Sequence, residues 1–324
     1  MVLVLIAVGV VIKPNKTSVC KEGTSYGECS SIKPYYCEEG ILVENASVCG
    51  CSNVSVVSGD FCFSYYQNRS QDISLRYILR GEEEEINFTA YSGMYNYVSE
   101  ITREIYYGAG ETPSRGDFKL KSINEEKQRE LLLPLVIKIL NTAKNRDDAV
   151  RIAVSIVQNI PYGFSNKTTI VIGNLEANYS RYPYEVLYEQ KGVCGEKSAL
   201  LAFLLKEMGY NVSFFYFSSE NHEAIGIKCP LEESFGNTGY CFIETTAPAV
   251  INDGSIEYVG GITLDSQPEI IPISEGSSIE KGWYEYQDAD VLEKIREGKF
   301  VLLRDLKLNK IIEKYGLVEE YHPA

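Results

Sequence analysis

KGVCGEKSALLAFLLKEMG, residues 191–209, predicts a helix of about four turns that begins at Cys194. Gly209 is placed to end it, because glycine is favoured just beyond a helix C-terminus. The helix contains an unbroken apolar run from Ala199 to Leu205. A cysteine in the first turn of such a helix can be a core thiol, half of a disulfide or a nucleophile. The other cysteines of the chain limit this choice.

Six of the nine cysteines lie within 43 residues of a Gly- and Ser-rich segment. They are Cys20, Cys29, Cys37, Cys49, Cys51 and Cys62. In an extracellular chain this density predicts three disulfides, with a pairing that the sequence does not define. Zinc is the alternative, but no Cys-x-x-Cys pair occurs and the gaps are not those of a zinc finger. We therefore predict a disulfide module over residues 15–66.

Cys229 and Cys241 flank a Gly- and Asn-containing loop between two apolar, β-branched segments. This pattern predicts a β-hairpin with a long loop and a disulfide across its base. Cys194 is then left alone. An unpaired cysteine in an extracellular protein indicates either a reactive thiol or one that awaits a partner chain.

Two features place the chain outside the cell. Residues 1–12 are nearly all apolar, which is too short for a membrane span but typical of a signal-peptide core. We predict a clipped signal peptide or a membrane anchor over residues 1–14, with a buried first strand as the alternative. Eight of the 18 asparagines begin an Asn-x-Ser/Thr glycosylation motif, more than random placement gives. A secreted or anchored surface glycoprotein, for example of archaeal type, fits both features.

The net charge of −14 excludes a nucleic-acid-binding protein, which needs a basic face, and also electrostatic docking on anionic lipid. Membrane contact is expected only through an N-terminal anchor. We expect no cofactor and no metal ion, since no EF-hand-like calcium loop occurs.

Periodicity and turn residues predict the order of elements along the chain. Arg80–Glu85, RGEEEE, is interpreted as a solvated loop, and the Gly/Pro-rich residues 254–276 as a loop. The expected helices cover residues 91–107, 123–142 with a break or kink at Pro134, 147–158, 185–188, 194–208, 289–298 and 306–315. The expected strands cover residues 211–217 and both arms of the hairpin. This order predicts an α+β fold in which the cysteine-headed helix packs on a small antiparallel sheet.

Three side chains form a candidate catalytic group. The N-terminus of a helix supplies partial positive charge and free N–H groups, which favour a thiolate at Cys194. Of the two histidines, His322 lies near the C-terminus and His222 at the start of a strand, so His222 is the candidate base. Glu244, on the partner strand, is the candidate carboxylate that orients the imidazole.

Strand parity tests this grouping. His222 and Glu244 are even-numbered, whereas Cys229 and Cys241 are odd-numbered. One antiparallel register can put the first pair on one face and the second pair on the other. The registers ideal for each pair differ slightly, and either a register midway between them or the length of the Glu side chain would satisfy both.

Residues 147–248 resemble the transglutaminase-like superfamily. The resemblance rests on GVCGEKSALLAFLL, then NHEAIGI, then YCFIETTAP, and on VQNIPYGF upstream. It implies a papain-like fold over residues 67–324, with Cys194 as nucleophile, His222 as base and Glu244 in the place where the family usually has Asp. The aromatic residue that the family has after the histidine is absent, and Glu223 and Ala224 stand there instead. Gln158 and Gln190 are candidates for a second oxyanion donor, beside the backbone N–H of Cys194.

The sequence therefore predicts an extracellular thiol enzyme that hydrolyses or exchanges amide or isopeptide bonds in proteins or cell-surface peptides. An inactive transglutaminase-like binding protein is the alternative. A redox or covalently dimerised protein that uses Cys194 is a third. The position of Cys194 relative to His222 and Glu244 separates the first two.

Overall fold

The computed structural model describes residues 19–171, 175–254, 263–299 and 301–317. The expected signal peptide or anchor over residues 1–14 and the C-terminal His322 lie outside these ranges. Among the described residues, the helices are all too short or too polar to cross a membrane.

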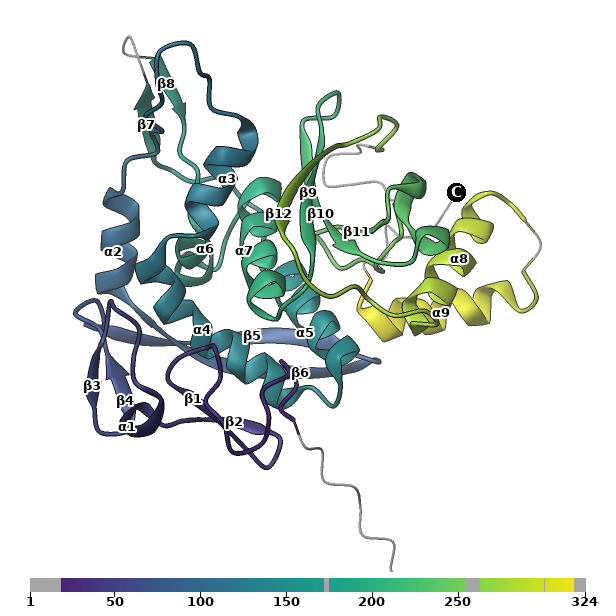
Figure 1. Cartoon of the computed structure of the whole chain (residues 1–324). Coiled ribbons are helices and arrows are strands. Elements are labelled where there is room, and N and C mark those ends of the chain that lie inside the picture. Colours follow the sequence, from purple (N-terminus) through teal and green to yellow (C-terminus); the bar gives the residue numbers. More distant parts are fainter. Residues whose placement is uncertain (1–18, 172–174, 255–262, 300, 318–324) are drawn as a thin grey trace, which may run out of the picture.

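A four-stranded antiparallel sheet organises the C-terminal half, in the order β11-β10-β9-β12 (Figure 1). The strands are β9 (Val212–Phe217), β10 (His222–Lys228), β11 (Tyr240–Ile243) and β12 (Glu269–Ser274). The sheet confirms the predicted hairpin and adds β12, which lies in a segment predicted to be a loop. β12 contains Pro272, which an edge strand tolerates because one side of its backbone has no ladder partner.

Helix α7 (Cys194–Glu207) packs on one face of this sheet, against β9 and β10 (Figure 1). Residues Ala199–Leu205, which form the unbroken apolar run, are all buried. The other face carries Phe215, Phe217 and Phe242, which share a core with α8 (Tyr284–Arg296) and α9 (Arg304–Tyr315). The sheet therefore lies between α7 and the C-terminal helix pair.

Before α7 the chain forms α2 (Ser92–Glu100), α3 (Arg115–Ile123), α4 (Glu126–Thr142), α5 (Arg146–Asn159) and α6 (Pro183–Glu189). Four of these helices, α3 to α6, pack against α7, and α2 packs against α4 and α6. Of the break or kink expected at Pro134, the break is wrong: α4 runs through this residue, which is inside the helix. The helix predicted over residues 91–107 ends at Glu100, and α3 was not predicted at all.

A long hairpin of β5 (Ser70–Leu79) and β6 (Glu82–Tyr91) packs against α4 and α5. The interpretation of RGEEEE as a solvated loop is wrong, since only Arg80 and Gly81 form the turn and Glu82–Glu85 begin β6. The four glutamates are exposed and pair along the strand through their backbone, so their charge did not prevent a strand. A shorter pair, β7 (Thr168–Val171) and β8 (Leu175–Asn178), follows α5.

All four expected disulfides are present. The N-terminal cysteines pair as Cys20–Cys37, Cys29–Cys49 and Cys51–Cys62, and Cys229–Cys241 closes the hairpin. The elements between them are β1 (Tyr35–Glu38), β2 (Ile41–Glu44), α1 (Ala46–Cys49), β3 (Val56–Ser58) and β4 (Phe61–Phe63).

This cysteine-rich segment is tied to α4. The Asn141 side chain accepts a hydrogen bond from the Leu42 N–H (3.0 Å) and donates one to its carbonyl (2.9 Å). Lys21 Nζ donates to the Leu140 carbonyl at the C-terminal end of the same helix (2.7 Å). Cys37 and Leu42 belong to the main core of the chain. The cysteine-rich segment therefore packs onto the rest of the chain and shares its core.

Candidate active site

Cys194 is the one free cysteine and is half-buried. It occupies the first helical position of α7, where backbone N–H groups have no partner within the helix. Glu196, two residues further on, accepts a hydrogen bond from the Val193 N–H (3.0 Å) and forms an ion pair with Arg181 (2.8 Å). These bonds fix the start of the helix and with it the position of the thiol.

His222, at the first position of β10, hydrogen-bonds the Cys194 thiol through its side chain. Its Nε2 lies 2.9 Å from Glu244 Oε2, which leaves Nδ1 for the sulfur. Burial lowers the pKa of His222, but the hydrogen bonds and negative charges of Cys194 and Glu244 outweigh burial and raise the pKa to about 10. The imidazole is therefore held between the thiol and the carboxylate.

Glu244 directly follows β11 and is 2% exposed. Its Oε1 accepts three hydrogen bonds, from the Thr245 N–H (2.9 Å), the Thr246 N–H (2.6 Å) and the Thr246 hydroxyl (2.5 Å). Burial raises the pKa of Glu244, but the His222 and Thr246 contacts reverse this and leave the pKa below its usual value. The extra methylene relative to Asp therefore folds back on the chain while Oε2 still reaches the imidazole.

The strand register lies midway between the two ideal ones, which is the first of the two alternatives. Ile225 pairs with Ile243 and Gly226 with Phe242. This register serves both the disulfide at the base of the hairpin and the His222–Glu244 contact. Strand parity thus predicted which side chains meet.

Lys197 was missed by the sequence reasoning. It lies three residues after Cys194 in α7, is fully buried, and donates to the carbonyls of Gln158 (3.3 Å), Ile160 (2.6 Å) and Thr246 (3.0 Å). Burial lowers its pKa to about 7, against the opposing charge of Glu244. The signal in the sequence was a lysine one turn into the helix, just before its unbroken apolar run.

The two glutamines proposed as oxyanion donors have other partners. Gln158 is buried: its Nε2 donates to the Glu244 carbonyl (2.8 Å) and its Oε1 accepts from Arg151 (2.6 Å). Arg151 in turn pairs with Glu285 of α8 (3.1 Å). Gln190 donates to the Leu187 carbonyl at the end of α6 (2.7 Å). Gln158 therefore supports the backbone of Glu244, and Gln190 caps a helix.

The segment after α5 lies beside the loop that leads to Cys194. Gly163 N–H donates to the Gly192 carbonyl (3.1 Å), and Tyr162 forms a parallel bridge with Gly192. Burial and the negative charges of Cys194, Glu196 and Glu244 raise the pKa of Tyr162. Tyr162 stacks edge-on against the exposed Phe164, with ring centroids 5.9 Å apart. An accessible aromatic pair therefore flanks the thiol.

Glu223, in place of the family's aromatic residue, packs over the residue that follows the thiol. It pairs with Arg115 (2.7 Å) and with Lys119, both on α3. A Cβ on Gly195 would lie 2.1 Å from the Glu223 carboxylate, so only glycine fits there without a shift. Residue 195 is therefore a close approach between α7 and β10.

Residues 133–230 match a family model described as "DUF553: Transglutaminase-like domain". The match spans under half of the chain. It includes Cys194 and His222 and ends before Glu244. The family expected from the sequence motifs is supported over these residues.

Among solved structures, Legionella pneumophila LapG is similar to this chain. One LapG structure shares 13% identity, covers 48% of this chain and 81% of that chain, and has a TM-score of 0.26. Calcium-bound LapG shares 11% identity over 53% of this chain and 97% of that chain, also with a TM-score of 0.26. None of the curated proteins matches the chain.

Proposed function

We propose that this chain is an extracellular thiol hydrolase that cleaves amide or isopeptide bonds in protein or peptide substrates. The observation that carries the proposal is the line of contacts from Cys194 through His222 to Glu244, at the N-terminus of a buried helix. A nucleophile, a base and a carboxylate that orients the base are the three groups that acyl transfer requires. The transglutaminase-like match over residues 133–230 supports the same chemistry.

The reaction begins with the Cys194 thiolate and the protonated His222. The sulfur attacks the carbonyl carbon of the amide, and the N–H of Cys194 stabilises the negative oxygen of the tetrahedral intermediate. His222 then gives its proton to the leaving amine, and the C–N bond breaks to leave a thioester. Water loses a proton to His222 and attacks the thioester, which restores the thiolate and the protonated imidazole and releases the carboxylic acid, which then ionises in water.

Glu244 keeps the imidazole in the orientation that both proton transfers need. Its Oε2 accepts from Nε2, so Nδ1 faces the sulfur in every step. Lys197 and Gln158 hold the Thr246 and Glu244 carbonyls and thus the turn that carries the carboxylate. The aromatic pair of Tyr162 and Phe164 offers the substrate an apolar surface beside the thiol.

The four disulfides are typical of an oxidising compartment, which supports an extracellular location. Within the proposal, glycans attach at the exposed motifs of Asn53, Asn87 and Asn166. They are absent from Asn211, whose Nδ2 donates to Glu275 (3.1 Å). Glycan mapping by mass spectrometry after expression in a secretory host tests this, and a glycan on Asn211 would contradict it.

A peptide library tests the function. The library contains main-chain amides and lysine isopeptides and is incubated with oxidised protein in water labelled with heavy oxygen. Hydrolysis gives new carboxylates that carry the label with the native chain and not with Cys194→Ser. An added primary amine shows exchange as an unlabelled amide product. If no library member yields a product that depends on Cys194, the chain is an inactive binding member.

A further inference from the structure

A cavity of about 390 Å³ opens beside the first turn of α7. Its walls come from α3, from residues 180–182 and from α7, which contributes Gly195 and Ala199. Gly195 is the residue that follows the nucleophile, so the cavity wall begins one residue from the thiol. The cavity is therefore placed to receive a part of the substrate next to the bond that is cleaved.

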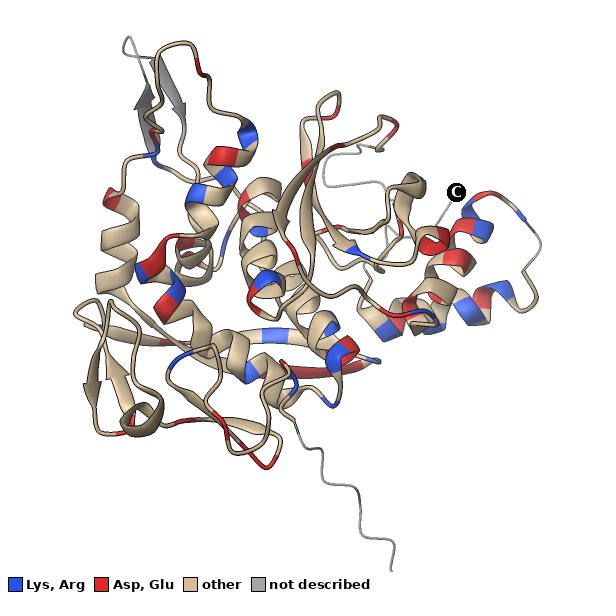
Figure 2. Cartoon of the chain, in the orientation of Figure 1, with Lys and Arg blue, Asp and Glu red and all other residues tan. Residues whose placement is uncertain are grey.

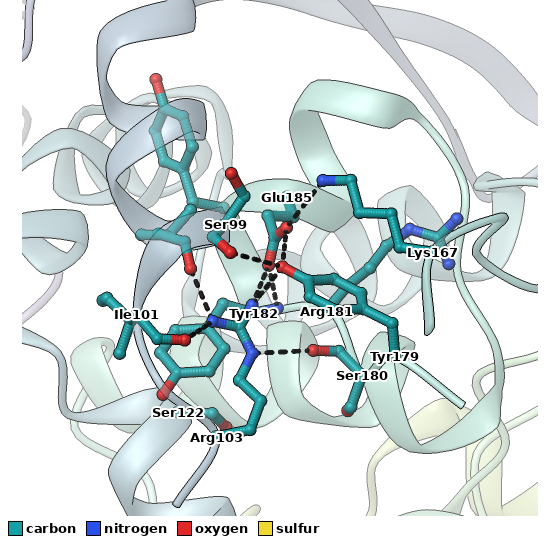
Figure 3. Close-up of polar contacts among 12 residues, drawn as sticks. Ser99, Ile101, Arg103, Ser122, Lys167, Tyr179, Ser180, Arg181, Tyr182 and Glu185 are labelled. Atoms are coloured by element: carbon teal, nitrogen blue, oxygen red, sulfur yellow. Dashed lines mark hydrogen bonds and ion pairs between the residues drawn. The ribbon is translucent and has the colours of Figure 1, made fainter. Parts of the chain in front are cut away.

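Five basic side chains line this cavity, in a protein with a net charge of −14. They are Arg103, Arg115, Lys119, Lys121 and Arg181. No carboxylate belongs to the lining that the structure describes. Ser122 and Ser180 add polar groups, and Figure 3 shows both beside Arg103.

Two of these cations are neutralised by the fold. Arg103 pairs with Glu185 (2.7 Å) and lies over the rings of Tyr179 and Tyr182, as Figure 3 shows. Arg181 is 3% exposed and pairs with glutamates on both α6 and α7. These two arginines shape the wall, and their charge is matched by carboxylates behind it.

The three cations of α3 are not matched in the same way. Arg115 and Lys119 share one carboxylate, that of Glu223. Lys121 donates to two backbone carbonyls and makes no described ion pair. Asp117, between Arg115 and Lys119 in the sequence, caps its own helix at Ser114 and does not line the cavity. Figure 2 shows the basic residues of α3 in blue and acidic ones in red. The α3 wall therefore carries a surplus of about two positive charges beside the positive end of α7.

We propose that this cavity is a substrate subsite for a carboxylate. The carboxylate is either an Asp or Glu side chain or the free C-terminus of the substrate, held by the α3 cations while Cys194 attacks the neighbouring amide. A guanidinium and two ammonium groups suit a carboxylate because each can form a charge-assisted hydrogen bond with it. The inference rests on the proposed function, since it names the substrate class of the same site.

Three iodoacetyl probes that differ by one group test the subsite without any known substrate. They are N-iodoacetylglutamate α-amide, N-iodoacetylglutamine with a free α-carboxylate, and N-iodoacetylglutamine α-amide, which is neutral. In each the Cys194 sulfur forms a bond to the methylene carbon and iodide leaves. At low ionic strength we expect at least one carboxylate probe to label Cys194 roughly fivefold faster than the neutral probe. The faster of the two identifies the source of the carboxylate.

Variants distinguish the effect of the cavity's cations on the probe preference from the effect of the overall electrostatic field. Lys121→Gln and Arg115→Gln should each reduce the preference about two- to threefold. Lys144→Gln, the same charge change at an exposed residue with no described side-chain partner, should leave it unchanged. An equal rate for all three probes overturns the subsite, as does a preference that survives both α3 variants.

The rate with plain iodoacetamide on the same samples reports the thiol alone. A fast, His222-dependent iodoacetamide reaction without a carboxylate preference removes the subsite and keeps the hydrolase. A slow reaction that does not depend on His222 removes the hydrolase. In that case the ratio between probes, measured at about pH 9 where an ordinary thiol ionises, still decides whether the cavity attracts carboxylates.

Discussion

Lys197→Met should change how the stability of the protein depends on pH. The native ammonium is buried against three carbonyls, and its pKa is about 7, whereas the unfolded chain has the ordinary value of 10.5. Between these values the unfolded chain binds more protons, so the native protein gains stability as pH rises. The destabilising effect of burial is complete below about pH 7 and disappears toward pH 10.5. Methionine has no such dependence.

The size of the effect follows from the shift. At 1.36 kcal/mol per unit, the native chain gains about 2.5 kcal/mol relative to Lys197→Met between pH 6 and pH 9. Denaturant unfolding at both pH values, in a Cys194→Ser background that prevents disulfide exchange, measures the difference. Lys144→Met, at an exposed position, is the control and should show almost no change. A difference between native chain and Lys197→Met that stays constant from pH 6 to pH 9 would refute the reasoning. It would mean that the carbonyls and Glu244 keep the ammonium charged throughout.

Three further changes test the site and its support. Glu244→Gln should lower the rate of Cys194-dependent turnover or alkylation by about 10²–10⁴-fold, because the amide presents an N–H to His222 and favours the wrong tautomer of the imidazole. Glu244→Asp should lose less of this rate. Equal rates for the native chain and Glu244→Gln would contradict the role of Glu244. Gly195→Ala should destabilise the chain by about 1–3 kcal/mol in denaturant titrations, since its Cβ would lie 2.1 Å from the buried Glu223 carboxylate. An unchanged midpoint of the unfolding transition would contradict that packing. Replacing Cys229 and Cys241 together by serine opens a loop of 12 residues and should lower the free energy of unfolding by about 3 kcal/mol in the same titration. A decrease below about 1 kcal/mol would show that the hairpin is stable without the disulfide.

The sequence predicted the elements that carry Cys194, His222 and Glu244 better than the scaffold around them. Cys194 heads a helix with an uninterrupted apolar run and a glycine stop, both of which are local signals that the tertiary structure kept. The hairpin next to which Glu244 lies, and whose first strand begins at His222, could be predicted equally well, because its strands are short and apolar and a pair of cysteines closes it. Strand parity then predicted which side chains meet.

The errors arose where neighbouring elements overrode local preference. Glu82–Glu85 form a strand because β5 supplies a full ladder of backbone hydrogen bonds and leaves the carboxylates in water. Pro134 stays within α4, although proline in a helix interior usually breaks or kinks it. Its neighbours Leu133 and Leu135 are buried, so the packing of α4 outweighs the lost hydrogen bond.

The partners of buried polar residues were beyond reach for a different reason. The backbone carbonyls to which Lys197 and Gln158 donate lie 37 to 91 residues away along the chain. A backbone acceptor leaves no mark on the residue type at its position. The sequence could show that a lysine lies on a buried helix, and only the fold could show what it binds.

The basic cavity could not be predicted from the sequence either, because the fold brings its residues together. Arg115, Lys119 and Lys121 lie in a segment that the sequence reasoning did not predict to be a helix. Their spacing places Arg115 and Lys119 on the same side of α3, one turn apart, and the packing of α3 against α7 turns that side toward Gly195. The charge of the whole chain, −14, conceals this local surplus.

Alkylation of the unreduced, folded protein by iodoacetamide across about pH 4 to 9, with each cysteine mapped by mass spectrometry, tests the central claim most directly. Cys194 is the one free thiol, so it alone should be labelled. The account predicts rapid labelling already near pH 6, little further increase up to pH 9, and a loss of at least about tenfold at pH 6 in His222→Ala. Labelling that begins only above about pH 8, or that His222→Ala leaves unchanged, would contradict it and make Cys194 an ordinary thiol.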